Sequence, residues 1–201
     1  MKLLEQKENK DPCIMSNRRV ISIWFPNFGV ERILRLEEKN LDLPFATIEN
    51  QNGILVVYSL SDIAKNYGLH SGQPLRDAKA ICPTLITSIR NKQAEEKFLR
   101  AMARWAGKFT PWVSLELPDK LILDITGCSN LFGGEVSLVQ NIIKELENLK
   151  MTARIGLADT LGAAWALANY DICENGYIYR NIDYIDHETN ATRLRSAKQK
   201  K

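Results

Sequence analysis

The stretch VISIWFPNFGVERIL, Val20–Leu34, predicts a buried strand that is followed directly by a helix. Its first part, with Arg19 in front, reads RVISIWF and has the β-branched, apolar make-up of a strand covered on both faces. Pro26 should end this strand, because proline cannot donate a ladder hydrogen bond. The helix is expected from apolar side chains at helical spacing, namely Val30, Ile33 and Leu34, with Glu37 extending the pattern.

Composition sets loose limits on the rest of the chain. The 201 residues are 45% hydrophobic and carry a formal net charge of +3, which permits contact with nucleic acid without requiring it. The start, MKLLEQKENKDPC, is too charged for a signal peptide, and no later run is long enough to span a bilayer. We therefore expect a cytoplasmic protein with no membrane contact, beginning with a disordered leader over 1–17. The four cysteines lie far apart and predict neither a zinc site nor disulfides.

A small group of short elements is expected downstream of the first helix. PFATIE and GILVVYSL predict two strands joined by the turn-forming residues Asn50–Gly53. Ser61 and Asp62 offer a cap for a short helix, and a second short helix should begin at Leu75.

The second half of the chain has longer periodic segments. A helix from Gln93 should bury one apolar stripe and leave a charged face in water. The stripe comprises Phe98, Leu99, Met102, Trp105, Ala106 and Phe109, and the wet face Glu95, Glu96, Lys97, Arg100 and Arg104. WVSLELPDKLILDIT predicts a hairpin that turns at Leu117–Lys120.

A second amphipathic helix, a strand and a final helix complete the pattern. The helix GEVSLVQNIIKELENLK should turn six apolar side chains inward, namely Val136, Val139, Ile142, Ile143, Leu146 and Leu149. TARIGLA predicts a strand, and Asp159 with Thr160 can cap the last helix. The element order predicts an α+β fold of ferredoxin-like type, with the helices on one face of the sheet. After Tyr170 the pattern fails, so 171–201 is expected to be a poorly patterned basic tail.

Three stretches resemble one family in order and separation: LSDIAKNYGLHSGQPLRDAKAICPTL, LILDITGCSNLFGG and TARIGLADTLGAAWALA. Together they resemble the Y-family (UmuC/DinB-like) translesion DNA polymerases. The resemblance covers the palm and fingers of that family. It implies a ferredoxin-like palm over 18–35 and 90–170, and a small inserted fingers subdomain over 36–89. The thumb and little finger of the family have no counterpart in this sequence.

The resemblance also shows where catalytic residues of an active member would stand. Such a member needs three carboxylates for two magnesium ions, because oxygen ligands hold and orient that metal. The first motif is matched here by Trp24, Phe25 and Pro26, and the later acidic pair by Asp119 and Lys120. One carboxylate of three remains, so the sequence predicts no metal site, no cofactor and no catalytic residue.

The nucleotide-binding positions of the family are altered in the same way. Its Tyr-x-x-Arg pair is matched by Asp62 and Lys65, which exchanges an aromatic donor for an anion. Trp165 stands where the family has a lysine, and Gly29 stands at the sugar-gating aromatic. The resemblance therefore predicts that nucleotide binding has been lost.

The degenerate motifs are most similar to the non-catalytic, ImuB-type branch of the Y family. That resemblance implies a scaffold in DNA repair, translesion synthesis and SOS-induced mutagenesis. Its implied partners are damaged DNA, the sliding clamp, an ImuA-like protein and an error-prone polymerase. Four basic residues are candidates for DNA contact, Arg90, Lys92, Arg104 and Lys108, although a solvated helix face would explain several of them equally well.

Two other readings stay open. The chain could be an inactive remnant of such a protein. It could also be an active nucleotidyltransferase that uses Asp119, Asp124 and Glu116 as ligands. Asp119 and Asp124 are an odd number of residues apart, so one strand carrying both would point them to opposite faces. Asp119 after Pro118 is otherwise typical of a turn residue.

Overall fold

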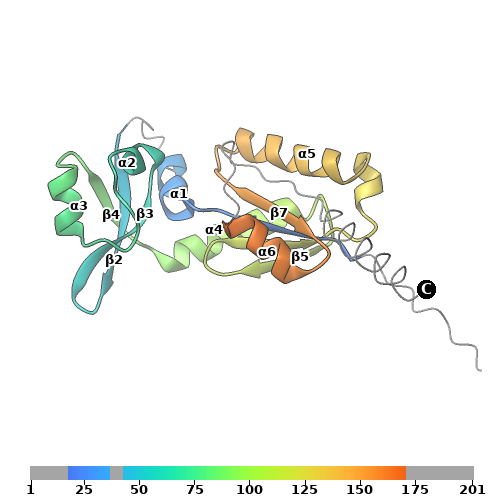
Figure 1. Ribbon diagram of the computed structural model, residues 1–201, viewed down its shortest axis with the longest axis horizontal. Helices are drawn as coiled ribbons and strands as arrows, with labels where there is room; N and C mark the ends of the chain where they lie inside the picture. The colour runs from blue at the N-terminus through green and yellow to red at the C-terminus, as the bar shows by residue number, and fades with distance from the viewer. Residues whose placement is uncertain (1–17, 37–42, 171–201) are drawn as a thin grey trace, which may run out of the picture.

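A computed structural model of the protein describes residues 18–36 and 43–170, which form two modules side by side (Figure 1). The four-stranded module carries β1, α4, β5, β6, α5, β7 and α6. The three-stranded module is built from β2, β3, α2, α3 and β4. Helix α1, Phe28–Leu36, follows β1 and contacts β2, β3 and α4. The predicted leader and the predicted basic tail lie outside the described residues.

The first module has the predicted ferredoxin-like topology. Its sheet has the order β5-β6-β1-β7, and every neighbouring pair is antiparallel. The strands are β1 (Val20–Trp24), β5 (Trp112–Glu116), β6 (Lys120–Asp124) and β7 (Arg154–Ala158). Helix α4, Lys92–Ala106, lies between β1 and β5 in the chain, and α5, Glu135–Asn148, lies between β6 and β7. Two split β-α-β units therefore interleave, which confirms the predicted α+β class.

The main core lies between this sheet and helices α4 and α5. Alternate strand residues face it, because successive side chains of a strand point to opposite faces. The buried cluster includes Ile21 and Ile23 of β1, Leu99 of α4 and Ile142 of α5. Helices α4 and α5 therefore lie on the same face of the sheet, as predicted.

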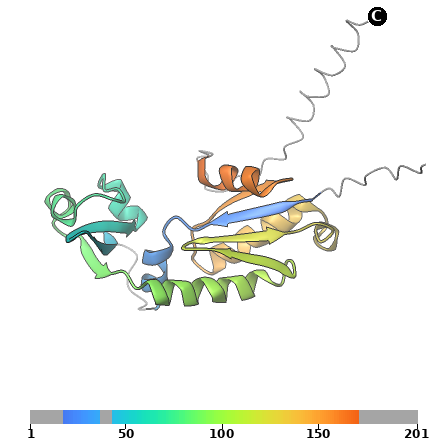
Figure 2. The same cartoon turned by 90° about the horizontal axis from the view of Figure 1, so that it is seen from below.

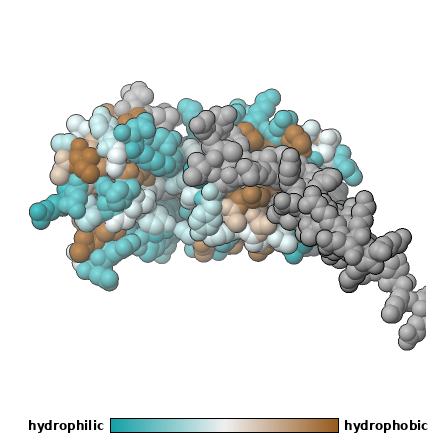
Figure 3. Space-filling view, in the orientation of Figure 1, coloured by the Kyte–Doolittle hydropathy of each residue, from teal (hydrophilic) through white to brown (hydrophobic). Residues whose placement is uncertain are grey.

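The prediction that all helices lie on one face of the sheet is wrong for helix α6, Leu161–Tyr170. This helix covers the opposite face (Figure 2). Val20, Ala158 and Ala164 form a second small cluster there. Gly156 of β7 permits the close approach, since a Cβ atom at this position would lie 2.2 Å from the carbonyl oxygen of Ala164. The outer side of α6 stays apolar: Figure 3 shows hydrophobic atoms on this face of the module, and Leu161 is 47% exposed.

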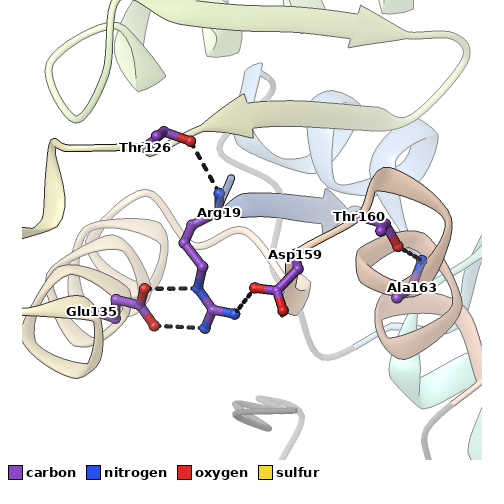
Figure 4. A network of polar contacts seen from close by, with 6 residues as sticks. All are labelled: Arg19, Thr126, Glu135, Asp159, Thr160 and Ala163. Carbon is purple, nitrogen blue, oxygen red and sulfur yellow. Dashed lines mark hydrogen bonds and ion pairs between the residues drawn. The ribbon is translucent and has the colours of Figure 1, made fainter. Parts of the chain in front are cut away.

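Arg19 joins β1 to both neighbouring helical segments (Figure 4). Its guanidinium donates to both carboxylate oxygens of Glu135, at 2.7 and 2.6 Å, and to Asp159 at 2.5 Å. Hydrogen bonding to Glu135 is the main reason that the pKa of Arg19 is raised above its ordinary value. Thr160 next to Asp159 accepts a hydrogen bond from the amide of Ala163, as the predicted helix cap requires.

The second module is a three-stranded sheet of order β3-β2-β4. Its elements are β2 (Phe45–Gln51), β3 (Ile54–Leu60), α2 (Asp62–Asn66), α3 (Leu75–Ile81) and β4 (Ile86–Ile89). The predicted β2–β3 turn contains Asn52 and Gly53, both at positive φ. Ser61 caps α2 by accepting from the amide of Ala64. Strand β4 was not predicted; it pairs in parallel with β2, a long-range contact that short sequence patterns do not encode.

Two predicted side-chain placements are wrong. Glu95, expected on the wet face of α4, is 3% exposed because it pairs with Arg90. Val136, expected to face inward from α5, is 50% exposed, and Leu138 is buried in the core instead. Val136 lies in the first turn of α5, which follows the short 3-10 helix Ser129–Phe132.

Candidate functional site

The end of β1 and the β5–β6 turn bring together Trp24, Asp119 and Lys120, which the sequence resemblance aligns with metal-binding positions. Trp24 pairs with Lys120 across the β1–β6 ladder, and the amide of Phe25 donates to the carbonyl of Asp119 at 3.0 Å. The indole nitrogen of Trp24 donates to Asp119 Oδ2 at 3.1 Å. The side chains at these aligned positions therefore bind one another.

Lys120 extends this cluster to α6. Its ammonium nitrogen lies 5.6 Å from the centre of the Trp165 ring and 3.8 Å from Asp119 Oδ1. On the other side, the guanidinium carbon of Arg154 lies 5.4 Å from the centre of the Trp24 ring. Trp24, Asp119, Lys120 and Trp165 are called the replacement cluster below. Its cation and aromatic contacts are of the kind that stabilise a folded protein.

Asp119 is the single carboxylate of the replacement cluster. Burial raises its pKa, while the hydrogen bond from Trp24 and the charges of Lys120 and Arg90 act in the opposite direction. Asp119 lies in the turn before β6 and Asp124 lies at the far end of β6, so one ion could not bridge them. Asp124 instead binds Arg18 at 3.1 Å.

These residues do not fit a magnesium site. An indole N–H donates and has no lone pair for a metal, and a lysine ammonium repels a cation by about 4 kcal/mol per pair of unit charges at 4 Å in a surface-like dielectric. Within 18–36 and 43–170, no group of three or more His, Cys, Asp and Glu side chains could hold a metal ion.

Asp62 and Lys65 lie on α2 and contact Asn27, just after β1. Asn27 donates to Asp62 at 2.9 Å, while the Lys65 ammonium donates to Asn27 at 2.5 Å and to Asp62 at 3.2 Å. The two side chains thus neutralise each other. Sequence reasoning missed Asn27, which gave no motif of its own.

Gly29 borders a hollow between the two modules. The hollow measures about 230 Å³, and its walls include Trp24, Tyr58, Glu95 and Asp119. A methyl group at Gly29 would lie 3.0 Å from Glu95 Oε1, so this side of the hollow is closely packed.

Arg90, a predicted DNA contact, lies at the boundary of the modules with only 9% of its side chain exposed. It donates to Glu49 of β2 at 2.7 Å and to Glu95 of α4 at 2.8 Å. Its guanidinium carbon also lies 3.4 Å from the centre of the Tyr58 ring. The structure therefore gives Arg90 a joining role that sequence reasoning missed.

The other predicted DNA contacts are more exposed, and Arg104 lies apart from the replacement cluster. Lys92 binds Glu49 at 2.5 Å. Arg104 is exposed on α4, and Lys108, just after that helix, is ion-paired with Glu145. Desolvation lowers the pKa of Lys108. Because α4 and α6 cover opposite faces of the sheet, Arg104 lies on the other face from Trp165.

Comparison with a family model decides the family. The model described as the impB/mucB/samB family matches residues 23–169, which include both modules. The chain belongs to the impB/mucB/samB family. Among the described residues of this family member, no helix is both long and apolar enough to cross a membrane.

Curated relatives of this family member include DNA polymerases IV and proteins named ImuB. It is 40% identical over 103 residues to Protein ImuB of Caulobacter vibrioides, covering 51% of this chain and 22% of that protein. It is 28% identical over 153 residues to DNA polymerase IV of Dehalococcoides mccartyi strain BAV1, covering 75% of this chain and 39% of that enzyme. The chain thus spans well under half the length of these relatives.

Solved structures support the same polymerase-type fold. The chain is similar to a post-insertion binary complex of Dbh DNA polymerase, with a TM-score of 0.70 at 20% identity. That match covers 84% of this chain and 50% of the polymerase chain. DinB from Sulfolobus solfataricus matches with a TM-score of 0.63 at 21% identity, covering 80% of this chain and 48% of that one. At these identities the likeness shows the fold, which is that of a Y-family polymerase.

Proposed function

We propose that this member of the impB/mucB/samB family is a non-catalytic, ImuB-like scaffold in DNA repair, translesion synthesis and induced mutagenesis. The observation that carries the proposal is the replacement cluster. Where the resemblance places three metal-binding carboxylates, Trp24 donates to Asp119 and Lys120 faces Trp165. A polymerase-type fold is kept while its catalytic positions bind each other.

The sequence relatives support this assignment. The ImuB match has the higher identity but covers 103 residues, and the DNA polymerase IV match covers 153 residues. We assign 18–35 and 90–170 to a palm and 36–89 to fingers. We also place the protein in the cytoplasm.

A primer-extension assay tests the non-catalytic part. Purified full chain is incubated with a primed template, all four deoxynucleotides and either magnesium or manganese, beside an active DNA polymerase IV as positive control. We expect no extension product. Extension that is abolished by Asp119→Ala would overturn the proposal in favour of a nucleotidyltransferase with unrecognised ligands.

A pull-down tests the scaffold part. Tagged full chain is recovered from cells after DNA damage, and bound proteins are identified by mass spectrometry. We expect enrichment of the sliding clamp, an ImuA-like protein or an error-prone polymerase. A folded bait that enriches none of them would favour the inactive remnant.

DNA binding is a further part of the proposal. Arg104 and Lys92 are exposed cations, and exposed cations bind phosphates with a strong dependence on salt. We expect weak binding of primed DNA by the full chain, reduced by Arg104→Ala and lost as salt is raised. Arg90→Ala should act through folding instead, because its guanidinium is held by Glu49 and Glu95.

A further inference from the structure

The hollow between the modules is lined by three residues that each have a buried polar atom without a hydrogen-bond partner. Glu95 Oε1, Ser59 Oγ and Asp119 Oδ1 are buried atoms that no group in the described part of the chain hydrogen-bonds. All three residues line the hollow, and Glu95 and Ser59 are only 3% and 4% exposed. Buried polar groups in folded proteins are nearly always hydrogen-bonded, and an ionised carboxylate can only accept, so the free oxygens of Glu95 and Asp119 point to a ligand that donates.

The carboxylates of Glu95 and Asp119 are each held through one oxygen, and the second oxygen of each has no hydrogen-bond donor. Arg90 holds Glu95 through Oε2 at 2.8 Å, and Trp24 holds Asp119 through Oδ2 at 3.1 Å. The remaining oxygen of Glu95 lies beside Gly29 on the wall of the hollow. Lys120 is 3.8 Å from Asp119 Oδ1, beyond hydrogen-bond distance. Each carboxylate is thus oriented by one partner and keeps an acceptor for another.

The size and the aromatic lining of the hollow favour a small, planar donor. Its aromatic walls are Trp24, Phe28 and Tyr58, and the exposed residues Ser71 and Pro118 also line it. Its volume of about 230 Å³ is several times the share of about 30 Å³ that one water has in the liquid. A guanidinium group is planar, presents five N–H donors and stacks on aromatic rings.

We propose that this hollow binds a guanidinium group, the side chain of an arginine presented by a protein partner. That the arginine comes from a protein rests on the scaffold function proposed above, whereas the guanidinium chemistry rests on the hollow alone. The planar group enters beside Ser71 and Pro118, stacks against the aromatic wall and donates to Glu95, Asp119 and the Ser59 hydroxyl. A nucleoside triphosphate fits poorly, because its anionic phosphates would meet two carboxylates.

Titration of the full chain with N-acetylargininamide, followed by NMR of the Trp24 indole N–H, tests the proposal. We expect a saturable shift of this resonance, and weaker binding of N-acetyllysinamide and of the neutral isostere N-acetylcitrullinamide. Asp119→Asn, which keeps an oxygen for Trp24, should weaken binding at least tenfold. Glu116→Gln, which removes a nearby carboxylate that does not line the hollow, should leave binding unchanged.

Ser59→Ala provides a second test if Asp119→Asn does not fold, and it should weaken binding severalfold. Equal binding of the citrulline compound, or no shift of the Trp24 resonance, would overturn the proposal. Displacement of the arginine compound by a deoxynucleoside triphosphate would overturn it as well. Primer extension is scored separately, so an active polymerase that still bound arginine would refute the scaffold function and leave the guanidinium site standing.

Discussion

The indole nitrogen of Trp24 donates a hydrogen bond to Asp119 across 3.1 Å, from the end of one strand to the turn before its neighbour. This bond occupies one oxygen of Asp119, a carboxylate that the sequence resemblance aligns with a metal-binding position. Since Trp24 also pairs with Lys120 in the β1–β6 ladder, the geometry of the sheet holds donor and acceptor together. The Trp24 side chain therefore stabilises the contact between β1 and the β5–β6 turn.

Replacing Trp24 by Phe should destabilise the protein by about 1–3 kcal/mol, because the variant leaves Asp119 partly buried without its donor. Urea unfolding followed by circular dichroism measures the change. Trp112→Phe is the matched control: Trp112 is 71% exposed, and its replacement should change stability by less than about 0.5 kcal/mol. Equal effects of the two variants would contradict a structural role for the Trp24–Asp119 bond.

Removing the Arg90 side chain should destabilise the protein more than replacing Trp24 does. Arg90→Ala leaves Glu95, whose side chain is 4% exposed, as a buried charge without its partner, which costs about 3–5 kcal/mol. Arg100→Ala removes an exposed pair with Glu96 and should change stability by no more than about 0.5 kcal/mol. Chemical denaturation of both variants measures the two changes in free energy of unfolding. A loss for Arg90→Ala as small as that for Arg100→Ala would show that the Arg90 guanidinium is not needed for stability.

Two glycines near α6 should respond in opposite directions to alanine. Gly156→Ala forces a methyl group against the Ala164 carbonyl and should destabilise the protein by at least about 1–3 kcal/mol. Gly162→Ala has no atom within 4 Å of the added group and should stabilise α6 by up to about 1 kcal/mol. Thermal unfolding of the pair tests whether α6 packs as closely on β7 as the structure shows.

Glu49 should make the free energy of unfolding depend on pH in the acid range. Hydrogen bonds from Lys92 and Arg90 lower its pKa below the ordinary value of 4.5. Its contribution to stability is therefore complete above that value and is lost as the pH falls through the folded-state pKa. The difference in free energy of unfolding between wild type and Glu49→Gln should shrink as the pH is lowered from 7 to 3. A difference that stays constant over this range would show that Glu49 titrates alike in both states.

Local elements were predictable because neighbouring residues encode them. The apolar, β-branched run of RVISIWF, the Asn52–Gly53 turn and the Ser61 cap each depend on residues close in sequence. Strand β4 was missed because its four residues pair with β2, about 40 positions earlier in the chain. Glu95 was misplaced for a similar reason, since only the arrival of Arg90 makes burial of a carboxylate tolerable.

The sequence by itself determined the α+β class and the order of most elements. Periodicity and motif spacing are sufficient for these conclusions, because they depend on local backbone preference and residue type. Tertiary structure alone decided that α6 covers the second face, that Arg90 joins the modules, and that Trp24 binds Asp119. These are contacts between distant segments, and their energy depends on distance and burial that only the folded chain defines.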